Sequence, residues 1–161
     1  MVKIALFLKA NLDSIEELKP LGPDFQWCLK FKCSNCDEVL EKWQYMSLSV
    51  FTRSPRGNMV NHFVSKCKLC HRENSMTILE DTIQSYTIDD NGEFKQMVVF
   101  DCRGIEPIDF SPGEGWYARA VSEGKEFEDV DLSEGEWADY CDKTKTPCGI
   151  FEIEHKFEKV K

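Results

Sequence analysis

Two CxxC motifs constrain this chain more than any other feature of its sequence. They are Cys33-Ser34-Asn35-Cys36 and Cys67-Lys68-Leu69-Cys70. Two residues between the cysteines allow both thiolates to face one point, and two such motifs supply four sulfur ligands for a tetrahedral zinc ion. The sequence therefore predicts a single structural Zn²⁺ whose ligands are Cys33, Cys36, Cys67 and Cys70.

The long segment between Cys36 and Cys67 must itself be structured if the two motifs are to meet. Strands over residues 38–48 and 60–66 would return the chain antiparallel and bring the motifs together. The entropy cost of closing such a loop grows only slowly with its length. Zinc binding at structural sites contributes about 10 kcal/mol or more, so it outweighs that cost.

The length and composition indicate one globular domain. A chain of 161 residues can bury a sizeable core. Hydrophobic residues make up 42% of the chain and aromatic residues 12%, which is typical of folded rather than disordered proteins. Period-two alternation and frequent turn signals favour a mostly β fold. We expect a single domain of antiparallel sheets over residues 1–161, with few short helices.

Several segments carry the alternation expected of strands. The strand candidates are residues 2–10, 25–32, 38–48, 61–66, 75–86, 93–101 and 149–157. Turns or loops are expected at 54–58, 89–92 and 111–115, where Pro, Gly, Asn and Asp gather. The best candidates for short helices are residues 13–19 and 131–140.

A weak internal similarity suggests that the domain consists of two similar halves. Residues 29–36 can be laid over residues 98–105, which places Ile105 where Cys36 stands. Under this hypothesis residues 1–75 form a metal-binding half and residues 76–161 a copy that has lost its metal. The alternative is chance, because strand patterns recur in β proteins.

The net charge and the N-terminal residues indicate which partners and which compartment to expect. The formal net charge is −9, and an acidic chain without a basic run is a poor nucleic-acid binder. Residues 1–10 lack a secretory signal, and no apolar stretch approaches the roughly 20 residues of a membrane span. We expect a cytoplasmic or nuclear protein without a membrane or nucleic-acid partner. Eight cysteines in such a reducing compartment indicate metal or redox chemistry rather than disulfides.

The residues near the CxxC motifs leave some alternatives open. Local positive charge suits an anionic four-thiolate site, although the same residues could simply occupy the polar faces of strands. These flanking residues are Lys30, Lys32, Lys66 and Lys68. His62 and His71 are alternative ligands, and a redox-active CxxC is a further reading. A thioredoxin-like motif is disfavoured because no βαβ pattern surrounds either motif.

A four-thiolate site is closed to water, so catalysis would have to come from elsewhere. The densest other cluster lies within residues 101–110, where Cys102 could act as a nucleophile or Glu106 could pair with Asp109. No histidine lies nearby in the sequence to act as a base. The alternative is an ion pair of Arg103 with a carboxylate that fixes a turn. We therefore expect no enzymatic activity.

The remaining cysteines carry less information. Cys28 alternates with apolar neighbours and is expected to be a buried thiol. Cys102 has no CxxC partner. Cys141 and Cys148 are candidates for a second soft-metal or redox site, and ordinary thiols are the favoured alternative.

Six ordered segments carry a resemblance to a known family. They are KIALFLKANL, LKFKCSNC, KWQYMSL, KCKLCHRENSMTI, FDCRGIEPIDFSP and GIFEIEHKF. In this order they resemble the eukaryotic CXXC-motif-containing zinc-binding protein family, from Lys3 to about Phe157. The resemblance implies a mostly β domain with two similar halves and one zinc ion bound by the paired motifs. It implies no catalytic residue and leaves the biological role open.

The leading hypothesis is a small zinc protein whose metal is structural and which acts through contacts with a protein partner, as a monomer. One alternative is a metal-handling protein, a carrier or sensor of zinc or copper that exchanges the ion through exposed thiols. Another is an enzyme with a pocket near Cys102, Glu106 and Asp109.

Overall fold

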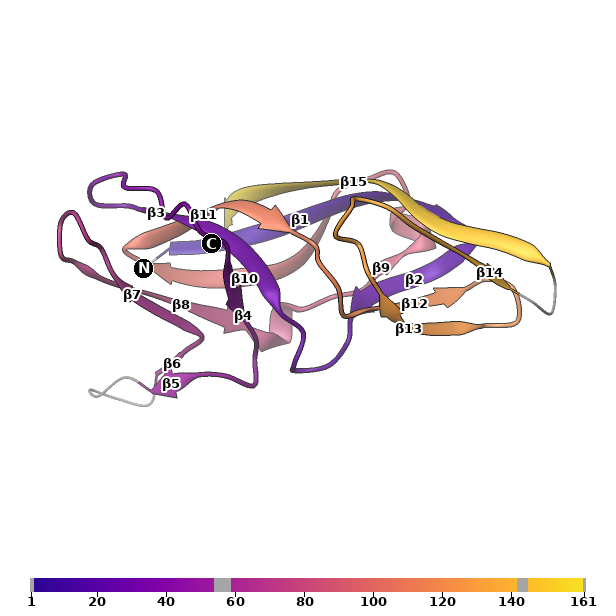
Figure 1. Ribbon diagram of the computed structural model, residues 1–161, viewed down its shortest axis with the longest axis horizontal. Coiled ribbons are helices and arrows are strands. Elements are labelled where there is room, and N and C mark those ends of the chain that lie inside the picture. Colours follow the sequence, from indigo (N-terminus) through magenta and orange to yellow (C-terminus); the bar gives the residue numbers. More distant parts are fainter. Residues whose placement is uncertain (1, 54–58, 142–144, 161) are drawn as a thin grey trace.

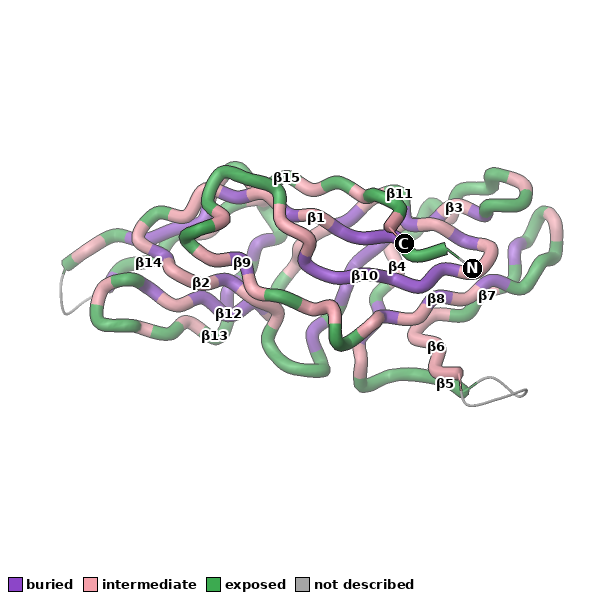
Figure 2. The backbone as a smooth tube through the Cα atoms, turned by 180° about the vertical axis from the view of Figure 1, so that it is seen from behind, coloured by how far each residue is buried: buried purple, intermediate pink, exposed green. Residues whose placement is uncertain are grey.

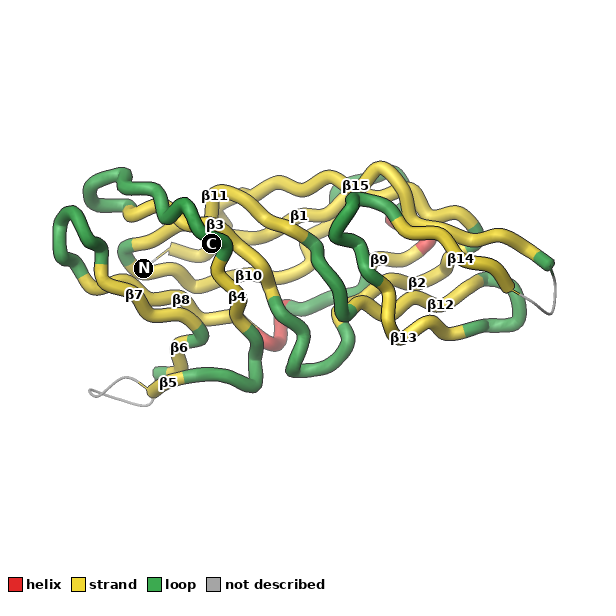
Figure 3. The backbone as a smooth tube through the Cα atoms, in the orientation of Figure 1, coloured by secondary structure: helices red, strands yellow, loops and turns green. Residues whose placement is uncertain are grey.

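The chain folds into an elongated body of antiparallel strands (Figures 1 and 3). The structure is a computed structural model, and it describes residues 2–53, 59–141 and 145–160. The loop expected at residues 54–58 lies outside the described residues. Within the described ranges the only helical segments are two single 3₁₀ turns, η1 (Glu80–Thr82) and η2 (Ile88–Asp90). The prediction of a mostly β fold is confirmed.

The largest sheet runs the length of the molecule. Its six strands follow the order β14-β15-β1-β10-β8-β7, and all neighbours are antiparallel. Strands β1 and β15 form its longest ladder, from the pair Lys3 and Val160 to the pair Asp13 and Gly149. The bounds are β1 (Val2–Asp13), β7 (Phe63–Lys66), β8 (Glu73–Leu79), β10 (Lys95–Arg103), β14 (Trp137–Cys141) and β15 (Thr146–Val160).

Three smaller sheets complete the fold. A three-stranded sheet has the order β11-β3-β4, a four-stranded sheet has the order β13-β12-β2-β9, and β5 pairs only with β6. Their bounds are β2 (Ile15–Pro20), β3 (Trp27–Cys33), β4 (Gln44–Met46), β5 (Thr52–Arg53), β6 (Val60–Asn61), β9 (Tyr86–Thr87), β11 (Ile105–Ser111), β12 (Trp116–Ala120) and β13 (Glu126–Val130).

Aromatic rings join the three larger sheets into one core. Trp27 of β3 is 1% exposed, and its ring meets Phe100 of β10 edge to face, with the centroids 6.0 Å apart. Phe25 lies between Trp27 and Trp116 of β12, at 4.8 and 4.9 Å. Such edge-to-face pairs stabilise a core beyond the area that they bury. Buried residues run along the middle strands of the body and exposed ones gather in the loops (Figure 2).

The internal duplication is not confirmed. The segments laid over one another belong to different sheets, since β3 lies in the three-stranded sheet and β10 in the six-stranded one. Ile105 faces Cys33 across the β3–β11 ladder and does not take the place of Cys36 in a second motif. The largest sheet also mixes strands from both proposed halves, because β1 lies between β10 and β15.

Both helix predictions are wrong. Within 13–19 the chain forms β2, whose buried residues Ile15 and Leu18 are three apart, as on a helix face. The pairing of β2 with β12 shifts between Arg119, which faces Glu17, and Ala120, which faces Ile15. The extra residue of this bulge in β2 lets Ile15 and Leu18, three apart, face the same side of the sheet. Within 131–140 the structure contains a turn and the start of β14, which pairs with β15.

The strand candidates are mostly confirmed, with one large exception. Of the expected strand over 38–48 only β4 is regular, because Val39 makes a single bridge to Lys32 and Leu40 bonds only to the Phe31 carbonyl oxygen, at 2.9 Å. The candidate over 75–86 ends at Leu79, where η1 begins.

Tyr86 provides a test of how one buried hydroxyl stabilises the fold. Its side chain is fully buried, and its hydroxyl lies within hydrogen-bond distance of the carbonyl oxygens of Asp90 (2.6 Å), Glu93 (2.7 Å) and Ala10 (3.2 Å). It also accepts a bond from the Ala10 N–H at 3.2 Å. Replacing Tyr86 with Phe removes these bonds, although the Ala10 and Asp90 carbonyl oxygens still accept from the N–H groups of Gly92 and Glu93. We expect a loss of about 2 kcal/mol in the free energy of unfolding.

Urea unfolding of the Tyr86→Phe variant measures this loss. The matched control is Tyr140→Phe, because Tyr140 is exposed; it should change the stability by less than about 0.5 kcal/mol. Equal stabilities of the two variants would contradict the assignment.

Candidate metal centre

The first CxxC motif ends β3 in a tight turn. The Cys33 N–H donates to the Glu38 carbonyl oxygen at 2.8 Å, and the Asp37 N–H donates to the Cys33 carbonyl oxygen at 2.9 Å. Asp37 adopts a left-handed backbone with φ of 63°. Aspartate is among the few residues besides glycine that adopt this conformation readily. The turn folds Cys36 back beside Cys33.

The second motif repeats this turn between β7 and β8. The Cys67 N–H donates to the Arg72 carbonyl oxygen at 2.9 Å, and the His71 N–H donates to the Cys67 carbonyl oxygen at 2.9 Å. His71 has φ of 63°, as Asp37 has. The two motifs are therefore equivalent turns, in which the residue after the second cysteine is left-handed.

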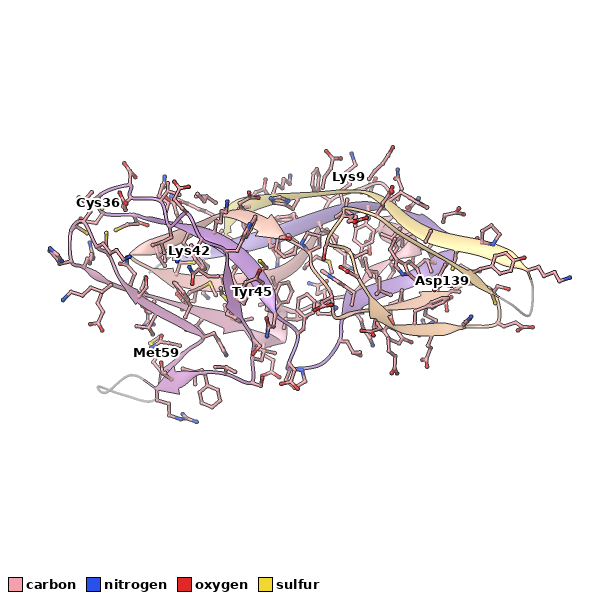
Figure 4. All side chains as sticks on the ribbon, viewed as in Figure 1. Lys9, Cys36, Lys42, Tyr45, Met59 and Asp139 are labelled. Atoms are coloured by element: carbon pink, nitrogen blue, oxygen red, sulfur yellow. The ribbon has the colours of Figure 1, made fainter. Side chains whose placement is uncertain are left out.

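The two turns meet at one end of the molecule (Figure 1), and Figure 4 shows Cys36 at that end. Beneath them the rings of Phe31 on β3 and Phe63 on β7 stack at 4.8 Å with an interplanar angle of 13°. This stack joins two strands that share no ladder. Packing thus brings the motifs together across the long segment between them.

The sulfur atoms fit the dimensions of one tetrahedral zinc site. The Cys33 and Cys70 Sγ atoms lie 3.7 Å apart, the Cys36 and Cys67 Sγ atoms 3.5 Å, and all four lie within 4.8 Å of one another. A Zn–S bond of about 2.3 Å places ligand sulfurs about 3.8 Å apart. The separations are far too long for disulfides, and all four cysteines are free.

The electrostatics of the cluster favour a bound cation. Burial raises the pKa of the Cys33 thiol, but hydrogen bonds to its sulfur, led by those from the N–H groups of Cys36 and Asn35, together lower it to about 6. For Cys36 the Glu38 N–H lowers the pKa, whereas burial and hydrogen bonds to the other three thiols raise it to about 12. Four adjacent thiols cannot all ionise alone, and a divalent cation reverses that balance by binding thiolates.

Two residues that the sequence did not single out support the first motif. Asn74 of β8 is buried, and its side-chain amide lies between Cys33 and Gly104. We favour the orientation in which Nδ2 donates to the carbonyl oxygens of Gly104 (3.0 Å) and Glu73 (3.2 Å), because the reverse places Oδ1 against two acceptors. The Gly104 carbonyl oxygen also accepts a bond from the Ser34 N–H at 3.0 Å.

The flanking cations lie beside the site without bonding to its sulfurs. Lys32 pairs with Glu106 at 3.1 Å and Asp37 at 3.7 Å, and Lys30 lies over the ring of Trp43. The cation that spans the two motifs is Arg72, whose Nη1 donates to the Asn35 side-chain oxygen at 3.5 Å.

Neither alternative histidine joins the sulfur cluster. His62 accepts a hydrogen bond at Nδ1 from the Ile78 N–H, at 2.8 Å, and burial lowers the pKa of its imidazole. The exposed His71 occupies the left-handed position of the second turn. The grouped ligands of the described residues are the four cysteines alone.

The structure does not gather the candidate enzyme residues into one site. Cys102 and Glu106 line a cavity of about 400 Å³ beside the first motif, whereas Asp109 lines a different cavity with His155, 3.2 Å away. Burial, with Asp101 nearby, raises the pKa of Cys102 to about 12, so this thiol is a poor nucleophile. Arg103 makes no ion pair with any described residue, and Gly104, with φ of 73°, shapes the turn.

The other cysteines lie apart from the cluster. Cys28 is buried as expected, and burial raises the pKa of its thiol. Cys141 and Cys148 are buried on the hairpin β14–β15 at the far end of the molecule, where burial also raises the pKa of Cys148. The candidate site residues that lie together are thus the four cysteines of the two CxxC motifs.

Together the fold and the site define a class, a β protein with a four-cysteine zinc-type centre formed by two CxxC turns. Sequence comparison identifies the family. Residues 5–158 match the family described as "CXXC motif containing zinc binding protein, eukaryotic". The chain belongs to this family, and the expectation of a zinc protein is confirmed.

Relatives match along almost the whole chain. The "CXXC motif containing zinc binding protein" of Rattus norvegicus is 51% identical, and that of Homo sapiens 49% identical, each over 99% of both chains. A solved structure titled "Crystal Structure of C1orf123" matches with a TM-score of 0.95 and 47% identity, covering 98% of this chain and 99% of that one. The family is named for zinc binding and not for an enzymatic activity.

No helix within residues 2–53, 59–141 and 145–160 has the length and apolar character that crossing a membrane requires.

Proposed function

We propose that this chain binds one structural Zn²⁺ through Cys33, Cys36, Cys67 and Cys70 and acts through contacts with a protein partner. The observation that carries the metal assignment is the meeting of two equivalent turns with their four Sγ atoms within 4.8 Å. Four thiolates fill the tetrahedral coordination of zinc and leave no position for a reacting water. A closed site of this kind has a structural role.

The segment between the motifs explains why a cross-link is needed there. Strands β5 and β6 have two residues each and pair only with one another, and β4 has three. Short ladders of this kind stabilise a chain weakly. The ion supplies a cross-link between β3 and β7, while the turn N–H groups stabilise the thiolates.

Metal content and exchange test the proposal. Native mass spectrometry should show one zinc ion per chain, and a mild chelator should remove it over hours rather than minutes. Slow release is expected because all four ligands of the ion are held by turns at the ends of packed strands. The absence of zinc from a folded chain would contradict the assignment.

Metal handling is a second candidate. Cys36 and Cys70 are only partly buried, whereas Cys33 and Cys67 are buried, and the centre lies at one end of the molecule. A carrier needs such access for a second set of thiolates. Release within minutes from a chain that stays folded would favour this function over the structural one.

The partner class follows from charge. A net charge of −9 disfavours a nucleic-acid partner, so we infer a protein partner. We also propose that the chain is a monomer in the cytoplasm. An enzymatic function is not proposed, because Asp109 lies in a different cavity from Cys102 and Glu106 and the Cys102 thiol is buried.

A further inference from the structure

The outer face of the three-stranded sheet carries a second concave surface. Ser111, Cys28 and Tyr45 face one another in register across β11, β3 and β4. These three residues lie in the wall of a cavity of about 670 Å³. Figure 4 shows Tyr45 near the middle of the molecule, well away from Cys36.

One wall of this cavity is aromatic. Trp43 and Tyr45 line it, and Tyr45 is 64% exposed although it is large and apolar. Tyr45 lies directly opposite Cys28 in the β3–β4 ladder. The Lys30 ammonium lies 4.7 Å from the centroid of the Trp43 ring. The Trp43 ring thus already binds a cation of the protein itself, although Lys30 is not among the residues that line the cavity.

Unpaired carboxylates line the same region. Asp24 and Glu114 line the same cavity, and Glu134 lines an adjoining one of about 360 Å³. None of these three carboxylates forms an ion pair with a described residue. No lysine or arginine lines either cavity. Carboxylates in a concave surface attract cations more strongly than the same groups on a flat one.

We infer that this acidic, aromatic cavity binds lysine or arginine side chains of an extended basic segment of a protein partner. β4 is an edge strand, so its outer main-chain groups can pair with an added extended segment. Aromatic rings and carboxylates together recognise an ammonium or guanidinium group. The inference rests on the proposed function, because it names the chemistry of the protein partner.

Fluorescence anisotropy with a fluorescein-labelled peptide of alternating lysine and alanine tests the inference. The double variant Asp24→Asn/Glu114→Gln should weaken binding by about tenfold, and Tyr45→Leu by about fivefold. Both changes affect exposed side chains, so zinc content and melting temperature should stay as in the wild-type chain.

The matched control is Glu128→Gln/Asp129→Asn on β13, which changes the net charge equally at two exposed positions. It should weaken binding by less than about twofold. Equal weakening by the two double variants would overturn the inference, since binding would then follow net charge alone. Displacement by spermidine at the same concentration of positive charge would overturn the assignment to an extended peptide. A chain that needs zinc for stability but binds no basic peptide refutes this inference and leaves the zinc assignment intact.

Discussion

Replacing Cys67 with Ser is expected to remove the zinc ion and to lower the melting temperature by at least about 10 °C. The change removes one of four thiolates, and the remaining three cannot close the tetrahedral site. The effect should be local, because Trp116 of β12 packs against Phe25 in a part of the core that contains none of the four cysteines. Hydrogen exchange should therefore increase in residues 27–46 and 60–79 and stay unchanged in β12 and β13.

Cys148→Ser is the matched control for this experiment. Cys148 is also a buried, free thiol, but it lies on the hairpin β14–β15, remote from the cluster. It should keep its zinc, and its exchange pattern in residues 27–46 should match that of the wild type. If the zinc-free Cys67→Ser chain melted as the wild type does, the metal would not be structural.

Replacing Gly104 with Ala is expected to cost about 3 kcal/mol of stability. Gly104 has φ of 73°, which strains any residue with a Cβ atom. An added Cβ would also collide with the buried amide of Asn74. The turn that Gly104 forms accepts a hydrogen bond from Ser34, so zinc affinity should fall as well.

The Gly124→Ala variant separates the cost of backbone strain from the cost of the collision with Asn74. Gly124 has φ of 62°, but nothing lies within 4 Å of an added Cβ, so only the backbone strain of about 1 kcal/mol remains. The excess loss at Gly104 should shrink when Asn74→Ala is combined with Gly104→Ala. Equal losses at the two glycines in urea unfolding would show that Asn74 does not restrict the turn.

The sequence predicted the local geometry of the site but not its support. Two residues between cysteines determine how each turn folds, so the ligand set could be predicted from spacing. The roles of Asn74 and Gly104 depend on β8 and the β10–β11 turn meeting the first motif, and no local pattern encodes that meeting. The pairing of Asp109 with His155 could not be predicted either, because the two residues are far apart in the sequence.

Strands were predictable where the chain pairs with its neighbours in long, regular ladders. Alternation identified β1, β3, β10 and β15, which lie in long ladders. It failed at residues 13–19, where a bulge places Ile15 and Leu18 on one side with the spacing of a helix. It also failed over 38–48, because most of that segment finds no ladder partner and the strand shortens to β4.

The position of β15 has a consequence for biosynthesis. This last strand lies between β14 and β1, so it forms the interior of the largest sheet and not its edge. Because β15 follows its neighbours β1 and β14 in the sequence, β1 has one unpaired side along most of its length until residues 146–160 have left the ribosome. Both CxxC turns leave the exit tunnel well before that moment. Metal capture can therefore precede closure of the sheet, and the nascent chain needs protection of β1 until β15 has emerged.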